Sequence, residues 1–327
     1  MNQHRPFTIF FLPAVALRHV FQFLNPIELF EISQCSRKAT NIISRTIRFE
    51  MSIESSSGSM VFNNYSFMAI GRKNRQAEYP PTGIRVFDGN TESADVCYLS
   101  ENELLIYWDC PYIGFKTVLS HLTHLFNSTT SHLGLTNMSM PPAICLSIVE
   151  SIRSRQTVID SLVICSTTMS VEDISRIVNR LKVIEYLEIY QDPPRDLNIS
   201  FTSKSVYITF SSWITLKHLN SMKHCTVIRL RESTLTDEDM TSFLESWNSG
   251  ECPNLQYLSI KSNTLSKNFT VFGLPSLQDE VNKQWFEKRI CGISPIIYCP
   301  VEYKRDDGVV AKIHFDKKDR DIQLMVM

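Results

Sequence analysis

Glycine is scarce in this sequence, with only 10 among 327 residues. Enzymes that hold phosphates in glycine-rich loops need more of it, and neither a GxGxxG phrase nor a P-loop occurs. A GxSxG nucleophile elbow and an HExxH zinc motif are also absent. We therefore expect a protein that is not an enzyme, that has no catalytic residues and that carries no cofactor.

Strong net charge, long apolar runs and paired cysteines are missing as well. Lys and Arg number 33 against 34 Asp and Glu, so the net charge of −1 indicates no nucleic-acid or membrane-surface partner. No run approaches the roughly 18 apolar residues that a membrane-spanning helix needs. The nine cysteines are scattered without a CxxC pair, which favours reduced, mostly buried thiols over a disulfide framework. The composition, 43% hydrophobic and 20% charged, is that of a globular protein long enough for two or three domains.

Residues 12–43 predict three short helices in succession. Asn25 can cap the second helix, with Pro26 at its first position and Glu28 at the spacing of a capping box. Ser36 can cap the third helix. Helices this short bury too little surface to be stable alone, so they need a partner or the rest of the chain. Their apolar faces are Leu17, Val20, Phe21 and Leu24, then Leu29 and Ile32, then Ala39, Ile42 and Ile43.

The same stretch resembles an F-box. The resemblance is carried, in order and without a gap, by Leu12, Pro13, the helix to Leu24, the turn at 25–26, Leu29 and the SQCSRK phrase at 33–38. It implies docking onto the Skp-type adaptor of a cullin-based ubiquitin ligase. Residues 14–15 depart from the family, because an acidic residue often follows the Leu-Pro pair there. The matching adaptor-binding positions are Leu12, Pro13, Val20, Leu24, Leu29, Ile32 and Cys35.

A rival interpretation reads the beginning of the chain as a secretory signal. His4 and Arg5 precede an apolar stretch at 7–17, and the Ala-Val-Ala of residues 14–16 resembles a cleavage site. The protein would then be a secreted leucine-rich-repeat binding protein with an N-terminal signal peptide. The helical pattern runs straight through the supposed cleavage site, which favours an intracellular protein. Asn-x-Ser/Thr phrases, as if for glycosylation, occur at Asn64, Asn127, Asn137, Asn198 and Asn268.

Residues 51–112 predict a small antiparallel sheet that links the three helices to the C-terminal part of the chain. Short β-type runs lie at 60–62, 65–70, 84–87 and 104–108. Turn-forming residues at 55–58, 80–83 and 88–89 separate them. Residues 115–126 then predict a helix whose apolar positions are Val118, Leu119, Leu122 and Leu125.

From about residue 132 the chain becomes periodic. Three helices share one apolar pattern, and each is followed by an apolar-x-x-Leu-x-Ile strand at 159–164, 184–189 or 255–260. The helices have start signals in the prolines 141–142, in Ser170 with Asp173, and in Thr236 followed by three acids. Their apolar positions are Cys145, Ile148, Val149 and Ile152; Ile174, Ile177, Val178 and Leu181; and Met240, Phe243, Leu244 and Trp247.

Residues 255–265 contain the whole leucine-rich-repeat phrase LxxLxLxxNxL. Strands beginning at 159, 184, 206, 227 and 255 are separated by 25, 22, 21 and 28 residues, within the range of such repeats. A single strand and helix cannot bury their apolar faces alone, so neighbouring repeats would stack around one core. This part of the sequence therefore predicts a strand-helix solenoid.

The C-terminal residues predict one or two helical turns at 285–290, then strands at 297–303, 309–315 and 321–326. Asp306, Asp307 and Gly308 are a hairpin signal, and turn chemistry explains the two carboxylates better than catalysis does. The phrase at 304–313 resembles the ending of the F-box-associated domain that follows certain F-boxes. The fold class expected is α+β or α/β: an F-box at 6–48, a β-rich connecting region with a final helix at 51–127, a leucine-rich-repeat-like F-box-associated domain at 128–284 and a β-hairpin tail at 285–327.

Outward-pointing strand residues are the candidates for binding a target. In a leucine-rich solenoid these positions line the concave face, where partners usually bind, and tyrosine and arginine are enriched at interface hot spots. His121, His124 and Cys110 lack a further Cys/His pair at ligand spacing, so we expect no metal site. The candidate substrate-binding residues are Glu188, Tyr190, Tyr207, Arg229, Arg231, Tyr257 and Lys261.

The sequence thus predicts the substrate-recognition subunit of a Skp/cullin/F-box type ubiquitin ligase. The F-box would bind the adaptor and, through it, the cullin scaffold, while the repeat domain would bind an unidentified protein target. We expect the protein inside the cell, in the cytoplasm, the nucleus or both.

Overall fold

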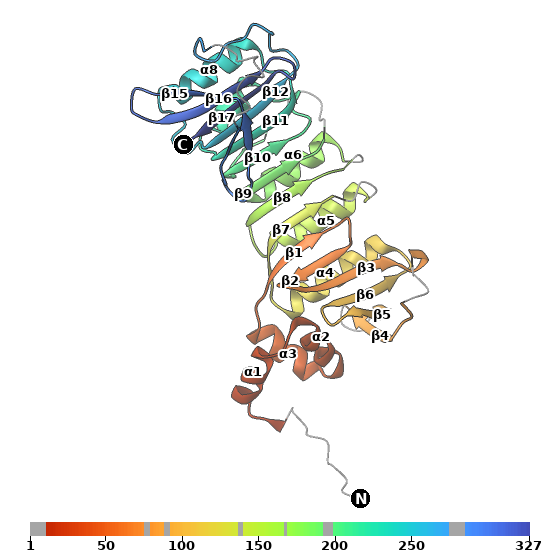
Figure 1. Ribbon diagram of the computed structural model, residues 1–327. Helices are drawn as coiled ribbons and strands as arrows, with labels where there is room; N and C mark the ends of the chain where they lie inside the picture. The colour runs from red at the N-terminus through yellow and green to blue at the C-terminus, as the bar shows by residue number, and fades with distance from the viewer. Residues whose placement is uncertain are drawn as a thin grey trace, which may run out of the picture. The chain divides into compact units, whose positions relative to one another are not determined.

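Three short helices begin the structure, a computed structural model that describes residues 11–74, 79–87, 92–136, 140–166, 169–191, 199–274 and 285–327 (Figure 1). Features expected at residues 4–10, 88–89, 137 and 198 lie outside the described residues. The chain divides into two compact units, Met1–Thr157 and Val158–Met327. No described helix combines the length and the hydropathy that crossing a membrane requires.

The helices α1 (Ala14–Gln22), α2 (Pro26–Cys35) and α3 (Arg37–Thr46) confirm the expected three-helix pattern. Glu28 donates its backbone N–H to Asn25 Oδ1 at 2.8 Å, and Asn25 N donates to Glu28 Oε2 at 2.8 Å. This reciprocal capping box satisfies two backbone donors that the helix end would otherwise leave without a partner. Ser36 caps α3 by accepting from Lys38 N at 3.2 Å.

A mixed seven-stranded sheet forms the rest of the first unit, in the order β7-β1-β2-β3-β6-β5-β4. Its strands are β1 (Glu50–Glu54), β2 (Ser59–Phe62), β3 (Tyr65–Gly71), β4 (Gly83–Phe87), β5 (Glu92–Ser100), β6 (Glu103–Trp108) and β7 (Thr129–Leu135), with the 3-10 turn η2 (Arg72–Asn74) after β3 and the helices α4 (Pro111–Leu125) and α5 (Pro142–Arg153). The four expected strands and both expected helices of this unit are present.

The expectation of a purely antiparallel sheet is wrong. β3 pairs with β6 in parallel, and β1 pairs with β7 in parallel. The turn signals suggested that each strand pairs with the next one in the chain. Instead, β4 and β5 lie on the far side of β6 from β3. The next strand in the chain, β6, then lies beside β3 and runs in the same direction as β3.

The aromatic ring of Phe30 on α2 joins the three helices to this sheet. It is fully buried, with its centroid 5.5 Å from that of Phe67 on β3 and 5.7 Å from that of Phe87 on β4. The ring of His121 on α4 meets it edge-on at 5.9 Å. The helix α4 approaches β6 closely at Gly114, where a Cβ atom would overlap the ring of Trp108. The three helices and the sheet therefore share one core.

Five parallel strands form most of the second unit, in the sequential order β8-β9-β10-β11-β12. They are β8 (Val158–Ile164), β9 (Lys182–Ile189), β10 (Ser205–Ile208), β11 (Val227–Ser233) and β12 (Tyr257–Ser262), with the helices α6 (Val171–Arg180), α7 (Leu216–Ser221) and α8 (Asp237–Asn248). The expected strands and the helices around residues 174 and 240 are confirmed. The expected capping box at Ser170 is formed, and the expected cap Thr236 also forms a capping box with Asp239.

Three antiparallel strands, β15 (Val301–Lys304), β16 (Val310–Asp316) and β17 (Asp321–Val326), extend this sheet past β12. The expected hairpin is confirmed, and Gly308 supplies the positive φ of 93° that its turn requires. The expected helix at 285–290 is wrong. Residues there form β13 (Trp285–Glu287), which pairs with β14 (Ile296–Tyr298) in a separate two-stranded sheet. The reason is that apolar residues of this segment, Ile290 and Ile297 among them, pack on the large sheet.

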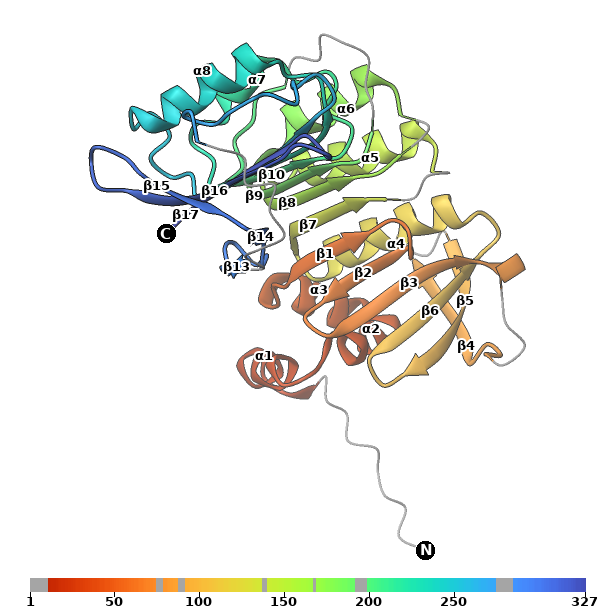
Figure 2. The same ribbon diagram turned by 45° about the horizontal axis from the view of Figure 1, so that its top comes forward.

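The two faces of the second sheet differ because side chains alternate along a strand. Figure 2 shows α6, α7 and α8 on the same side of strands β8–β12. The residues that face these helices are in register and fully buried: Val206, Ile228, Leu258 and Leu324 in one row, and Ile208, Leu230, Ile260 and Ile322 in the next.

We expect Phe30→Ala to destabilise the first unit by about 3–5 kcal/mol, because it removes a ring that the sheet and α4 surround. Phe23→Ala is the matched control, since Phe23 is 88% exposed and its loss should cost no more than about 0.5 kcal/mol. Chemical denaturation of both variants measures the difference. Equal stabilities for the two would contradict the shared core.

In the second unit, Leu258→Ala should lower the free energy of unfolding by about 2–5 kcal/mol, the usual cost of truncating a buried leucine. Val158→Ala, at a strand residue that is 42% exposed, should cost less than about 1 kcal/mol. Thermal melting of the two variants beside the wild type measures both effects. An unchanged Leu258→Ala midpoint would show that the leucine is not in the core.

Candidate binding surfaces

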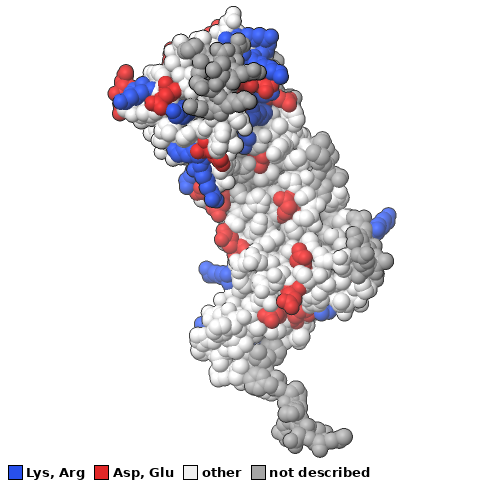
Figure 3. Space-filling model, viewed as in Figure 1, with Lys and Arg blue, Asp and Glu red and all other residues white. Residues whose placement is uncertain are grey.

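The helix α1 buries one face and exposes large apolar side chains on the other. Leu17 and Phe21 are fully buried, whereas Val15 is 65% exposed and Phe23 is 88% exposed. Phe11, just before the helix, is 87% exposed. Figure 3 shows few charged side chains on the visible face of the three N-terminal helices. Large exposed apolar side chains of this kind are candidates for contact with a partner.

The predicted adaptor-binding residues divide into three groups by burial. Pro13 and Cys35 are exposed, and Leu29 is fully buried. Leu29 therefore packs inside the protein and offers no surface to a partner in this structure. The sequence could not decide this, because an apolar position on an amphipathic helix can either pack in the core or contact a partner. The half-buried members are Leu12, Val20, Leu24 and Ile32.

Three exposed residues of this surface, Phe11, Val15 and Phe23, were not predicted from the sequence. Phe23 and Val15 fall between the positions of the buried stripe, so the helical periodicity assigned them to solvent. A phenylalanine on the polar side of an amphipathic helix was itself the available signal.

Polar contacts fix α2 against the edge of the first sheet. Arg85 on β4 donates Nε to both carboxylate oxygens of Glu31, at 3.0 and 2.8 Å, and Tyr98 on β5 donates its hydroxyl to Glu31 Oε1 at 2.5 Å. Gln34 Oε1 accepts from the backbone N–H of Val86 at 2.9 Å. Burial and the Glu31 carboxylate together raise the pKa of Tyr98 to about 12, so the phenol keeps its proton at neutral pH. The helix α2, which carries three of the seven predicted adaptor-binding residues, is therefore held against the sheet.

An open aromatic and cationic surface lies on the helix-free face of the second sheet. Tyr190 and Tyr207 meet edge-to-face with centroids 5.8 Å apart, and the guanidinium of Arg229 lies 4.5 Å above the ring of Tyr207. The Nε atom of Arg229 is buried and makes no hydrogen bond with a described residue. Glu188 accepts from the hydroxyl of Tyr186 at 2.7 Å. We call Glu188, Tyr190, Tyr207 and Arg229 the aromatic-cationic surface.

Tyr186 belongs beside these residues and was not predicted. It lies two residues before Glu188, on the same face of β9, so the alternation of the strand already indicated it. Burial raises the pKa of Tyr190 to about 12, with the Glu188 carboxylate adding to the effect. Burial raises the pKa of Tyr186 as well, so both phenols stay neutral and can donate hydrogen bonds.

The rest of this face is covered by the chain itself. Tyr257 is only 4% exposed, because it packs with Val227 and Met325 beneath Ile290 and Ile297 of the segment 285–299. The predicted contact of Tyr257 with a target is therefore wrong for this structure. The sequence did not show that the C-terminal residues fold back over the strand face.

Two further predicted residues are engaged with the C-terminal strands. Arg231 donates Nη1 to Asp321 Oδ2 at 2.8 Å, and Asp321 also accepts from Ser259 Oγ at 3.2 Å and from Gln323 Nε2 at 2.9 Å. Lys261 pairs with Asp319 at 3.1 Å. Of the seven predicted residues, four lie together in the aromatic-cationic surface. Tyr257 is covered by the segment 285–299, and Arg231 and Lys261 pair with β17 and the turn before it.

No group of three or more His, Cys, Asp or Glu side chains suited to a metal ion occurs among the described residues. Burial and the neighbouring His124 lower the pKa of His121 to about 4, and its ring packs on Phe30 and Phe87. Asp307 chelates the guanidinium of Arg305 and caps the hairpin turn, accepting from Val309 N at 3.1 Å. These contacts give Asp307 a structural role in the hairpin turn.

Comparison with known protein families gives two matches. The F-box domain matches residues 9–50, and a family described as F-box associated matches residues 193–260. The chain carries an F-box domain and an F-box-associated domain. No curated protein and no solved structure matches it.

The F-box domain includes α1, α2, α3 and all seven predicted adaptor-binding residues. The F-box-associated match runs from before β10 through most of β12, so Tyr207, Arg229, Arg231 and Tyr257 lie within it. Glu188, Tyr190 and Lys261 lie outside it, as does the phrase at 304–313 that resembles the ending of such a domain. The open surface is therefore built by the matched segment together with the strand before it.

We expect Ile297→Ala to loosen the cover over the sheet, because Ile297 is fully buried against Tyr257 and Met325. Hydrogen exchange should speed up at residues 285–299 while β12 stays protected, since β12 is also held by its two neighbouring strands. Ile296→Ala is the matched control, because Ile296 is 38% exposed and points the other way along β14. Equal exchange rates for the two variants would contradict the packing described.

Proposed function

We propose that this protein is the substrate-recognition subunit of a Skp/cullin/F-box type ubiquitin ligase. Its F-box domain binds the Skp-type adaptor, and its second unit holds a protein target. The protein performs no chemistry of its own. It brings the target to the ligase, so that transfer from the conjugating enzyme becomes effectively intramolecular.

The observation that carries this proposal is the F-box itself, with an apolar surface that no described residue covers. The side chains of Phe11, Val15 and Phe23 are more than half exposed, and Leu12 and Val20 of the same segment are half-buried. Burying such a set against a partner would supply the free energy that three short helices cannot obtain alone.

The aromatic-cationic surface is our candidate for holding the target. It offers two tyrosines and an arginine, the residue types that most often dominate binding energy at interfaces. The five strands β8–β12 follow one another in parallel in chain order, and we interpret residues 158–262 as a leucine-rich-repeat-like array. In such an array the helix-free face is the usual surface for a partner.

We also propose that the protein works inside the cell, in the cytoplasm, the nucleus or both. The helix α1 spans residues 14–22, and its buried Leu17 follows the Ala-Val-Ala sequence that a signal peptidase would have to cleave. Removal of these residues would eliminate the first turn of the F-box.

Adaptor binding tests the proposal. Leu12→Ala combined with Pro13→Ala should weaken binding of a purified Skp-type adaptor at least tenfold, because truncating a central anchor commonly costs about 2 kcal/mol or more. Isothermal titration with the full-length chain measures the affinity, and thermal melting confirms that the double variant is folded.

Ile84→Ala is the matched control for this experiment. Ile84 is an apolar residue of the same unit, 65% exposed, but it lies on β4, outside the F-box domain. Its removal should leave the affinity unchanged. A folded double variant that binds the adaptor as tightly as the wild type, or a wild type that does not bind it, would refute the proposal.

A further inference from the structure

The first unit contains a polar cavity of about 920 Å³ between the F-box helices and the helices α4 and α5. Its volume lies in the range of small-molecule binding sites. The side chains come from four places along the chain, the end of α2 with the start of α3, β4, α4, and the end of α5. The lining residues that carry charge or a ring nitrogen are Arg37, His121, His124 and Arg155.

The charge of this lining is one-sided. Two arginines contribute to it, and no described residue that lines the cavity is an aspartate or a glutamate. The side chain of Arg37 makes no ion pair or hydrogen bond with a described residue, and Arg155 is bound only by a neutral oxygen, Asn127 Oδ1, at 2.8 Å. Both guanidiniums therefore lack the carboxylate partner that a structural arginine usually has in a cavity.

The remaining lining is rich in neutral groups that form hydrogen bonds. They are Ser33, Gln34, Ser36, Thr40, Asn41, Ser120, Thr123, Ser151 and Ser154. The Nε2 atom of His121 is buried and has no hydrogen-bond partner among the described residues. The rings of Phe30 and Phe87 hold this imidazole in place, at 5.9 and 5.3 Å between centroids. A buried polar atom without a partner is costly, so this nitrogen points to a ligand atom.

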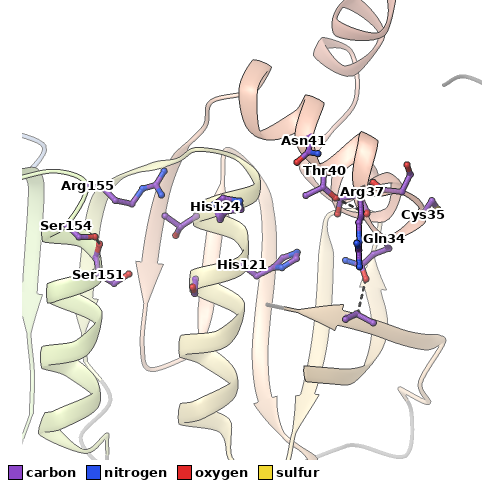
Figure 4. A pocket seen from close by; sticks show the side chains of 15 residues that line it. Gln34, Cys35, Arg37, Thr40, Asn41, His121, His124, Ser151, Ser154 and Arg155 are labelled. Carbon is purple, nitrogen blue, oxygen red and sulfur yellow. Dashed lines mark hydrogen bonds between the residues drawn. The ribbon is translucent and has the colours of Figure 1, made fainter. Parts of the chain in front are cut away.

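Figure 4 shows how these side chains are arranged. Ser151, Ser154 and Arg155 lie on one side, Gln34, Arg37 and Thr40 lie on the other, and the two histidines of α4 lie between them. The positive charges are thus at opposite walls with neutral donors and acceptors in the middle. The positive end of the ten-residue helix α3, at Ser36 and Arg37, adds to the field at one wall.

We infer that this cavity binds a small molecule that carries two phosphate groups on a hydroxyl-bearing frame. One phosphate pairs with Arg37 near the start of α3, and the other pairs with Arg155. The frame between them contacts the hydroxyl and amide side chains and the Nε2 atom of His121. A guanidinium suits this role because its planar donors match two phosphate oxygens at once.

This site differs from the proposed adaptor and target surfaces. It contains none of the exposed α1 residues and lies in the unit that lacks the aromatic-cationic surface. Cys35 alone is shared, as a predicted adaptor contact that also lines the cavity. A ligand there would bridge α3 to α5 and so stabilise the F-box against the rest of the first unit, because anything that binds only the folded state raises its stability.

Titration calorimetry with the full-length chain and fructose 1,6-bisphosphate tests the inference. The wild type should bind this probe, while fructose should not bind and inorganic phosphate should bind at least tenfold more weakly. Arg37→Gln and Arg155→Gln should each weaken binding of the bisphosphate about tenfold, since each removes one charged contact to a phosphate. The bisphosphate should also raise the melting temperature of the wild type.

The matched controls are Arg45→Gln, on α3, and Arg153→Gln, on α5. Arg45 lies on the same helix as Arg37, and Arg153 lies two residues before Arg155. Both control arginines are exposed and do not line the cavity, so both variants should bind within about twofold of the wild type. Loss of binding in the control variants would show that binding depends on the net charge of the protein rather than on the cavity arginines, and would overturn the inference. No binding of the bisphosphate by the wild type, equal binding of inorganic phosphate, or unchanged binding by both cavity variants would overturn it as well.

Discussion

The packing of Phe30 between the first sheet and α4 is the contact on which the N-terminal half of this protein depends. Three helices of nine or ten residues cannot form a stable domain by themselves. Phe30 gives them a share of a larger aromatic core, and the Glu31–Arg85 pair beside it fixes the direction of α2. The pair is about three-quarters buried on both sides, so the carboxylate and the guanidinium each satisfy a group that has lost water. The helix α2 is therefore held in place by the rest of the first unit without any partner.

The two faces of the sheet in the second unit differ in chemistry. Its helix-covered face holds rows of fully buried aliphatic residues, and its other face holds tyrosines and charged residues. On that second face, the folded-back segment 285–299 packs on Val227, Tyr257 and Met325 of β11, β12 and β17, while the aromatic-cationic surface lies on β9, β10 and the next part of β11. The four residues of the aromatic-cationic surface lie outside the cluster that this segment covers.

Local chemistry made much of this structure predictable. Asn25 and Ser170 were recognised as caps because a capping box involves only residues three apart, and Thr236 was recognised by the acids that follow it. The strands of the second unit followed from apolar residues at fixed spacing, and the final hairpin followed from its turn. The candidate target-binding residues were predictable only where the alternation of side chains along a strand decides which face of the sheet a residue lies on, as at Tyr190, Tyr207 and Arg229. Tyr257 obeys the same alternation, but its burial depends on residues about 35 positions later, which no local pattern reveals. The predictions for the pairing of β3 and for residues 285–287 were wrong for the same reason. The parallel pairing of β3 with β6 and the strand at 285–287 both depend on residues that are not neighbours in the sequence.

The antiparallel pairing of β17 with β12 has a consequence for how this architecture can vary. A row of parallel strands ends in an unsatisfied edge to which another strand, or another molecule, can add. Here β17 occupies that edge along five residue pairs, and the hairpin β15–β16 places a four-residue strand with Glu302 and Lys304 at the new border. No further parallel strand can therefore add to the sheet beside β12. Duplication of a strand-helix segment could lengthen the array only by insertion within it, and two copies of the protein cannot join through β12 to form a fibre.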